Sequence, residues 1–340
     1  MRNRFKHFLF SGLEIGQVNA LSRRTRKRSL LIITYHSVLP YSEKFNNFDY
    51  RNCVTSENFR EQLKFLKKKY NVVTMREAEE RLKADKLSGY ECVITFDDGF
   101  RNNHAHAMPL LVEAGLSAVF YISTAFIGRR EMLWTEKVNA ILLNADVPSV
   151  TIHLGGEQKL PLGNRLEREN ASVKVRTILK YKPWQVQENV VRELIEESGY
   201  EPRMVDADPE RYAFMNWDEV REMASAGMEI GSHTHNHYLL NMLSEEESYH
   251  ELKVSREQIE KELGTPCTLF SYPNGAEGNF LPVHFRQLEE LGYSSAVTQI
   301  PGVNHPGDNI YALNRTNISA RMDMAVFKSY LAGTQKLLTF

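Results

Sequence analysis

The feature that most constrains this chain is a series of short apolar runs, each of which ends abruptly in polar residues. Helical patterns separate these runs, and strands that alternate with helices predict parallel β/α units. A β/α barrel builds its active site from polar residues at the carboxyl ends of its strands. We therefore predict an α/β fold, a distorted (β/α) barrel of about seven strands. The runs cover residues 30–34, 92–94, 118–122, 228–230, 268–270, 295–298 and 310–313.

Four longer segments carry helical patterns with apolar residues on one face. Three of them stop at a glycine, which is a common residue just beyond the end of a helix. The predicted helices cover residues 56–70, 103–114, 217–226 and 244–263.

Residues 129–213 break the alternation of strands and helices. This stretch contains an Arg- and Glu-rich segment, a helical pattern over 184–197 and a candidate hairpin near 150–162. We interpret it as a mostly helical insertion that follows the third strand. The predicted organisation is a basic amphipathic segment over 1–28 and a barrel domain over 29–340 that carries the insertion.

The first 28 residues hold eight Lys and Arg residues against one acid, Glu14. Their apolar positions are too few and too interrupted to span a bilayer or to form a secretory signal. Two interpretations stay open: a helix packed on the domain, or a basic amphipathic helix on an anionic membrane face. We expect a cytoplasmic protein, with peripheral contact at the inner membrane face as the alternative.

The 340-residue chain has a formal net charge of −1, so no overall field draws it to nucleic acid. Its three cysteines, Cys53, Cys92 and Cys267, lie far apart and form no CxxC pair. Neither a disulfide framework nor a thiolate zinc site is therefore indicated. This cysteine usage fits a reducing compartment.

Two polar clusters carry the chemistry. Asp97 and Asp98 follow one apolar run, and a cluster from His233 to His237 follows another. Two histidines four residues apart can reach one ion if the backbone between them turns helical. Of two adjacent carboxylates, one can bind that ion while the other removes a proton from water. The combination predicts a metal-dependent hydrolase.

Three motifs resemble those of the polysaccharide deacetylase family, the NodB-like carbohydrate esterases. They are Thr95-Phe96-Asp97-Asp98-Gly99, His233-Thr234-x-x-His237 and Phe270-Ser271-Tyr272-Pro273-Asn274-Gly275. The resemblance spans about residues 30–320 without the insertion, and it implies a distorted barrel that removes acetyl groups from sugars with a metal's help. By position, it makes Asp97 the general base that activates a water on the metal. It assigns the metal ligands to Asp98, His233 and His237, and the oxyanion and substrate contacts to Tyr272, Pro273 and Asn274.

The chain departs from the family pattern in two places. The third motif opens with Leu269-Phe270 where many members have an arginine, and Leu313-Asn314-Arg315 stands where many have a Leu-x-His. We predict that Arg315 replaces the missing arginine and pairs with Asp97, which would hold that carboxylate ionised. The alternative is a salt bridge at the barrel rim without catalytic effect.

The form of the third motif resembles the poly-N-acetylglucosamine deacetylase branch, in which the general acid can come from an early Tyr-His motif. Tyr35-His36 matches that motif, so the resemblance makes His36 the general acid. A structural histidine is the alternative for His36, and His305 is the alternative acid. Trp134 could stack on a sugar ring or belong to the core.

The predicted activity is the metal-dependent removal of N-acetyl groups from amino sugars of a bacterial polysaccharide, exopolysaccharide or precursor. Zinc is the expected ion, and oxygen and nitrogen ligands also suit cobalt, nickel or manganese. The expected partner is an N-acetylated glycan or a lipid-linked sugar. Two alternatives stay open: an amidase or deformylase on a lipid-linked amino sugar, and an inactive metal-binding scaffold.

Overall fold

The computed structural model describes residues 28–46, 50–202, 208–320 and 322–334. Apart from Arg28, the predicted basic segment over 1–28 lies outside the described residues. No helix within the described ranges is both long enough and apolar enough to cross a bilayer.

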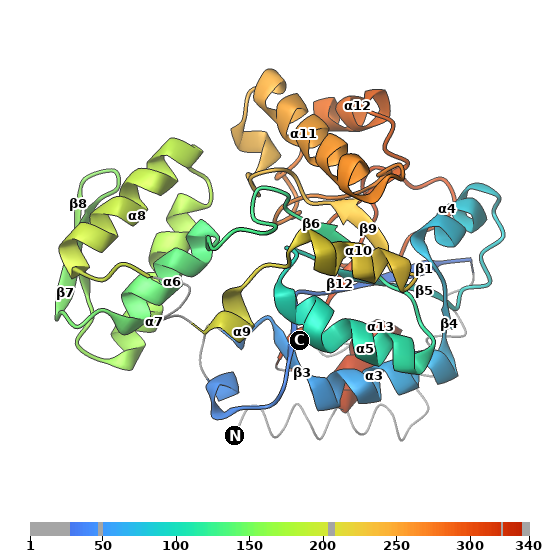
Figure 1. The fold of residues 1–340 in the computed structure, drawn as a ribbon, viewed down its shortest axis with the longest axis horizontal. Coiled ribbons are helices and arrows are strands. Elements are labelled where there is room, and N and C mark those ends of the chain that lie inside the picture. Colours follow the sequence, from blue (N-terminus) through green and yellow to red (C-terminus); the bar gives the residue numbers. More distant parts are fainter. Residues whose placement is uncertain (1–27, 47–49, 203–207, 321, 335–340) are drawn as a thin grey trace.

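A curled parallel sheet forms the centre of the fold (Figure 1). Seven strands follow one another across it and form a half-barrel, and a short strand, β4 (Asn71–Val72), pairs with β5. The predicted barrel of about seven strands is confirmed. In spatial order the seven are β11 (Ser295–Val297), β10 (Leu269–Ser271), β9 (Glu229–Ser232), β6 (Val119–Ile122), β5 (Glu91–Phe96), β1 (Leu30–Tyr35) and β12 (Thr316–Asn317).

Helices lie around the sheet and bury their apolar faces against it, which creates the main hydrophobic core. Local signals set their ends: Ser244 and Glu247 form a capping box before the longest helix, and Gly264 ends it with φ +68°. These helices are α3 (Ser56–Lys69), α4 (Met75–Lys83), α5 (Met108–Ala114), α10 (Trp217–Ser225), α11 (Glu245–Leu263), α12 (Pro282–Glu290) and α13 (Met324–Ala332). A π-helical segment over Asn103–Ala107 leads into α5, and short 3₁₀ turns lie at Glu43–Asn46 and Leu240–Met242. Two short parallel strands, β2 (Ser37–Leu39) and β3 (Cys53–Thr55), pair with each other.

The insertion has its own hydrophobic core and stands to one side of the sheet (Figure 1). Its antiparallel hairpin confirms the hairpin predicted near 150–162. Its elements are α6 (Trp134–Asn144), β7 (Ser149–His153), β8 (Glu157–Pro161), α7 (Arg165–Leu179) and α8 (Trp184–Ser198), followed by the short α9 (Pro209–Tyr212).

One predicted strand is wrong. Residues 310–313 form a turn in which the Ala312 N–H donates to Asn309 O, and only Leu313 bridges to Val297. The last strand, β12, begins at Thr316 instead. The turn buries Leu313 and places Arg315 at the carboxyl edge of the sheet, next to its neighbours β1 and β5.

Candidate active site

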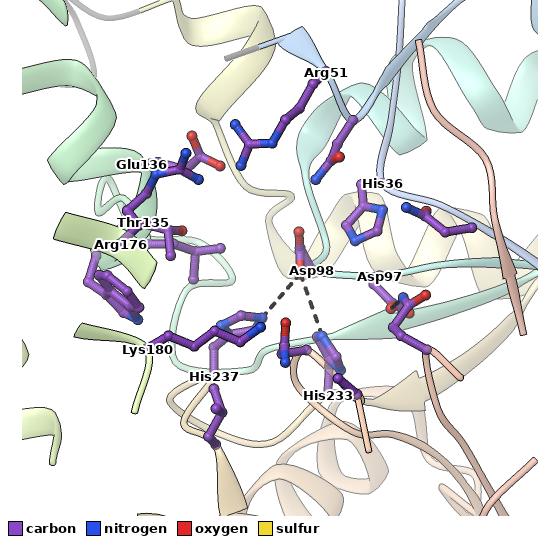
Figure 2. Close-up of a pocket in the computed structure, with 18 of the residues that line it drawn as sticks. His36, Arg51, Asp97, Asp98, Thr135, Glu136, Arg176, Lys180, His233 and His237 are labelled. Atoms are coloured by element: carbon purple, nitrogen blue, oxygen red, sulfur yellow. Dashed lines mark hydrogen bonds and ion pairs between the residues drawn. The ribbon is translucent and has the colours of Figure 1, made fainter. Parts of the chain in front are cut away.

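The carboxyl ends of the parallel strands gather the predicted site at one edge of the sheet. His36 follows β1, Asp97 and Asp98 follow β5, and His233 follows β9. They line one cavity of about 710 Å³ that lies between the half-barrel and the insertion (Figure 2). The topology therefore brings together residues that lie up to two hundred positions apart in the sequence.

Asp98, His233 and His237 form a cluster whose geometry fits a metal ion. The Nε2 atoms of His233 and His237 lie 3.5 and 3.3 Å from Asp98 Oδ1, and the three ligand atoms lie within 4.8 Å of one another. Ligand atoms of a tetrahedral zinc with bonds of about 2.0–2.1 Å are about 3.3 Å apart. The two distances to Asp98 Oδ1 are therefore close to what such an ion requires.

Backbone contacts set the tautomer of His233. Its Nδ1 lies 2.7 Å from Ser271 O, which can only accept, so Nδ1 carries the hydrogen and Nε2 presents a lone pair to the cluster. A metal-binding histidine usually donates its other ring N–H to a carbonyl or carboxylate oxygen in this way. Burial lowers the pKa of His233, but the charges of Asp97 and Asp98 outweigh it and raise that pKa overall.

The loop from His233 to His237 is not helical, and both histidines reach Asp98 without the helical turn that the spacing argument assumed. Thr234 and His237 adopt φ values of +64° and +59°. With this left-handed backbone, the imidazoles of His233 and His237 both face Asp98. Glu251 of α11 fixes the loop by accepting the backbone and side-chain N–H groups of Asn236 at 2.7 and 2.6 Å. His235 points elsewhere and meets Thr124 Oγ1 at 2.8 Å.

The turn after β5, at the carboxyl edge of the sheet, has a strained backbone. Asp98 has φ +79°, a conformation that costs a non-glycine residue of order 1–3 kcal/mol. Gly99 follows with φ +90°, and a Cβ there would lie 3.2 Å from Ile122 and Ile127. The turn therefore needs glycine at position 99 to present Asp98 to the two histidines.

Asp97 forms a buried bidentate ion pair with Arg315. The Nη1 and Nη2 atoms donate to Oδ1 and Oδ2 at 2.8 and 2.6 Å, and Gln299 Nε2 also donates to Oδ2 at 3.1 Å. Burial raises the pKa of Asp97, but the charges of Arg315 and His233 outweigh burial and lower that pKa overall. Asp97 is therefore ionised, and the predicted pairing with Arg315 is confirmed.

Arg315 is held by the strands on both sides of it. Its Nε donates to Thr298 O at 2.7 Å, and its terminal nitrogens also donate to the hydroxyls of Thr34, Thr95 and Ser271. Arg315 contacts Asp97 and is not among the described residues that line the cavity. A buried guanidinium with this many partners fixes the carboxylate of Asp97 in one orientation.

His36, the predicted general acid, lines the cavity beside Asp97 and Asp98 (Figure 2). Its Nδ1 is buried and has no hydrogen-bond partner among the described residues. Burial lowers the pKa of His36, and the charges of Asp98 and Asp97 oppose that effect only in part. His305, the alternative acid, is exposed, lies outside the cavity and faces Arg28 O.

The segment predicted to contact the oxyanion is Tyr272-Pro273-Asn274, and its three residues differ in whether a backbone N–H is available. The Tyr272 N–H donates to Val297 O at 3.2 Å, and Pro273 has no N–H. Asn274, with φ +59°, is the residue of the three that lines the cavity. Trp134 lines the cavity at the start of α6 and also packs on the core of the insertion.

Sequence reasoning missed several residues of this cavity. Gln299 comes from the loop after β11, and its contact with Asp97 has no signature in the sequence. Arg176 and Lys180 are spaced by one helical turn in the Arg- and Glu-rich part of the insertion, and that pattern alone reads as a solvated helix face. Arg51, before β3, joins them in the cavity.

The fold and site define a half-barrel with an Asp-His-His cluster at the carboxyl edge of its sheet, and sequence comparison relates the chain to polysaccharide deacetylases. The sequence profile of the polysaccharide deacetylase family matches residues 169–296, which include the histidine loop and the Phe270–Gly275 motif. YxkH of Bacillus subtilis, which bears the name of a polysaccharide deacetylase, is 23% identical over 315 residues, covering 92% of this chain and 80% of YxkH.

Solved deacetylase structures share the fold. PplD of Streptococcus pyogenes superposes with a TM-score of 0.59 at 18% identity, covering 89% of this chain and 98% of PplD. IcaB of Ammonifex degensii gives 0.58 at 19% identity, with 90% and 98% covered. The chain therefore shares its fold with these solved structures, and residues 169–296 match the polysaccharide deacetylase family.

Proposed function

We propose that this protein removes N-acetyl groups from the amino sugars of a bacterial polysaccharide, exopolysaccharide or precursor, with one divalent ion held by Asp98, His233 and His237. The observation that carries the proposal is an ionised, buried Asp97 held by Arg315 beside a cluster of metal-ligand geometry. Zinc suits two imidazoles and one carboxylate, and cobalt, nickel and manganese accept the same donors. When bound, the ion supplies an acidified water and polarises the acetyl carbonyl.

Asp97 accepts the proton of the attacking water, and its contacts select the oxygen atom that does so. Oδ2 already accepts hydrogen bonds from Arg315 and Gln299, which occupy both of its lone pairs. Oδ1 accepts one hydrogen bond, from Arg315 Nη1, and keeps its second lone pair. The proton therefore moves to Oδ1 while the guanidinium holds the carboxylate in place.

His36 donates a proton to the leaving nitrogen. An amide needs this step because an amine is a poor leaving group until it is protonated. The lowered pKa of His36 makes its protonated form a stronger acid than an ordinary imidazolium. We assign the stabilisation of the developing oxyanion to the N–H of Asn274, because Asn274 lines the cavity.

The test is product release from a panel of sugars by the metal-loaded protein. We expect acetate from oligomers of β-1,4- or β-1,6-linked N-acetylglucosamine, and none after chelation. Formate release from an N-formylated, lipid-linked amino sugar without acetate release would instead favour the deformylase. A protein that binds metal stoichiometrically but releases neither acid would be the inactive scaffold, which would overturn the proposal.

A further inference from the structure

The cavity has a second wall that the hydrolytic chemistry does not use. Arg51, Arg176 and Lys180 lie on one side of Asp98 in Figure 2, whereas His36 and Asp97 lie on the other. Arg176 belongs to α7, Lys180 immediately follows that helix, and Arg51 comes from the segment before β3. We call these three residues the basic wall.

Three cations and one acid line this side of the cavity among the residues that the structure describes. Among the described residues that line this side of the cavity, Glu136 of α6 is the acid, and its Oε1 also meets Arg211 Nη2 at 3.4 Å. Burial and, to a smaller extent, the nearby charge of Arg51 lower the pKa of Arg176 to about 10. Burial also lowers the pKa of Lys180. Cations that are partly desolvated near one another are stabilised by an anion placed between them.

The fold holds part of this wall in a fixed position. Arg176 Nε donates to the buried hydroxyl of Ser172 one turn earlier, at 3.2 Å. Ser172 in turn contacts Asn139 of α6, which ties α7 to the helix that begins the insertion. A guanidinium fixed in this way loses less entropy when it binds an anion.

We propose that the basic wall binds an anionic group of the substrate, a phosphate or a carboxylate on the glycan, while the N-acetyl group lies at Asp97 and Asp98. The inference rests on the proposed function and narrows its substrate class to anionic N-acetylated glycans. Arginine and lysine form their strongest hydrogen bonds with phosphate and carboxylate oxygens, and a cavity screens such pairs less than open solvent does.

The test compares three sugars with the metal-loaded protein: neutral N,N′-diacetylchitobiose, its 1-phosphate, and an N-acetylglucosamine disaccharide that contains glucuronate. We expect kcat/KM to be about tenfold higher or more for at least one anionic sugar, and the preferred sugar identifies phosphate or carboxylate as the source. In Arg176→Gln and Lys180→Gln, the loss on that sugar should exceed any loss on the neutral sugar by about tenfold. Lys174→Gln is the matched control, because Lys174 is an exposed cation of the same helix that does not line the cavity.

A binding measurement separates this inference from the proposed function. Calorimetry on metal-loaded Asp97→Asn should show tighter binding of the anionic sugar than of the neutral one, with the difference lost in Asp97→Asn/Arg176→Gln. If no sugar releases acetate while this difference persists, the proposed function fails and the basic wall stands. Equal kcat/KM for all three sugars, or a charge preference unchanged in both Gln variants, would overturn the basic wall whether or not acetate is released.

Discussion

Asp97 and Arg315 form a bidentate ion pair with N–O distances of 2.8 and 2.6 Å, and their side chains are 2% and 0% exposed. The two residues lie 218 positions apart, at the ends of strands on one side of the half-barrel. The pair links stability to chemistry, because the same contacts that neutralise a buried guanidinium also orient the proposed base.

Arg315→Gln should destabilise the protein, because it leaves the Asp97 carboxylate buried without its counter-charge. Breaking a buried pair by removing one partner costs about 3–5 kcal/mol. Urea unfolding of the wild type, Arg315→Gln, Asp97→Asn and the double variant measures the coupling between the two residues. A loss below about 1 kcal/mol for Arg315→Gln would contradict the account.

The conservative variant Arg315→Lys tests the positioning role separately. It keeps the charge but cannot bind both carboxylate oxygens, so the pKa of Asp97 should rise relative to the wild type. A base must be ionised, so the acid limb of the kcat/KM profile should move to higher pH. An acid limb that stays in place while activity falls would mean that Arg315 does not act through Asp97.

Asp97→Asn should retain the metal and lose hydrolysis. The amide oxygen can still accept a hydrogen bond from Arg315, but it cannot take a proton from water. Loss of a general base lowers the rate by about 10²–10⁴-fold. Elemental analysis and acetate release, measured on one preparation, report metal content and hydrolysis together. Near wild-type turnover of Asp97→Asn would mean that another residue is the base.

His36→Ala should harm amide hydrolysis far more than hydrolysis of an activated aryl acetate. A phenolate leaves without protonation, whereas the amine of a sugar does not, and loss of a general acid costs about 10²–10⁴-fold. The ratio of kcat/KM values for the two substrates is the measurement. Equal losses on both substrates, with metal retained, would show that His36 has a structural role.

Stability should fall in acid because of His284, which lies outside the active site on α12. Its buried Nδ1 accepts the Leu281 N–H at 3.0 Å, and burial lowers its pKa from 6.5 to about 4. The unfolded chain therefore binds a proton between those two values that the folded chain does not. The contribution of neutral His284 to the free energy of unfolding is therefore fully present above about pH 6.5. It falls by up to about 3 kcal/mol as the pH drops to about 4.

His284→Gln keeps an acceptor for the Leu281 N–H but does not titrate in this range. Urea unfolding at several pH values should show a flatter profile for this variant than for the wild type between pH 4 and 6.5. Parallel profiles would mean that other groups dominate the acid sensitivity.

The sequence was sufficient to predict the parts of the fold that depend on local pattern. Strands β1, β5, β6 and β9 overlap the predicted apolar runs, because buried parallel strands are rich in apolar residues. The run at 310–313 has the same composition but forms a turn, because Leu313 and Arg315 serve long-range contacts with β11 and Asp97. Helix α12 went unpredicted, since its only strong local signal is Pro282 at its start.

The site also has parts that the sequence predicts and parts that depend on long-range contacts. Motif spacing identified Asp97, Asp98, His233 and His237, because each pair is contiguous or lies on one loop. Spacing did not reveal the left-handed backbone at Thr234 and His237, which Glu251 supports from a separate helix. The basic wall could not be predicted, because its members meet only when the insertion docks beside the half-barrel.

The most direct test is a metal titration of chelated protein, with acetate release from an N-acetylglucosamine oligomer as the readout. Activity should return in proportion to zinc and saturate at one ion per chain. His237→Ala should neither bind zinc at that stoichiometry nor recover activity, whereas His235→Ala should do both, because His235 faces Thr124 and not the cluster. Full turnover without metal, or an active His237→Ala with one bound zinc, would contradict the account.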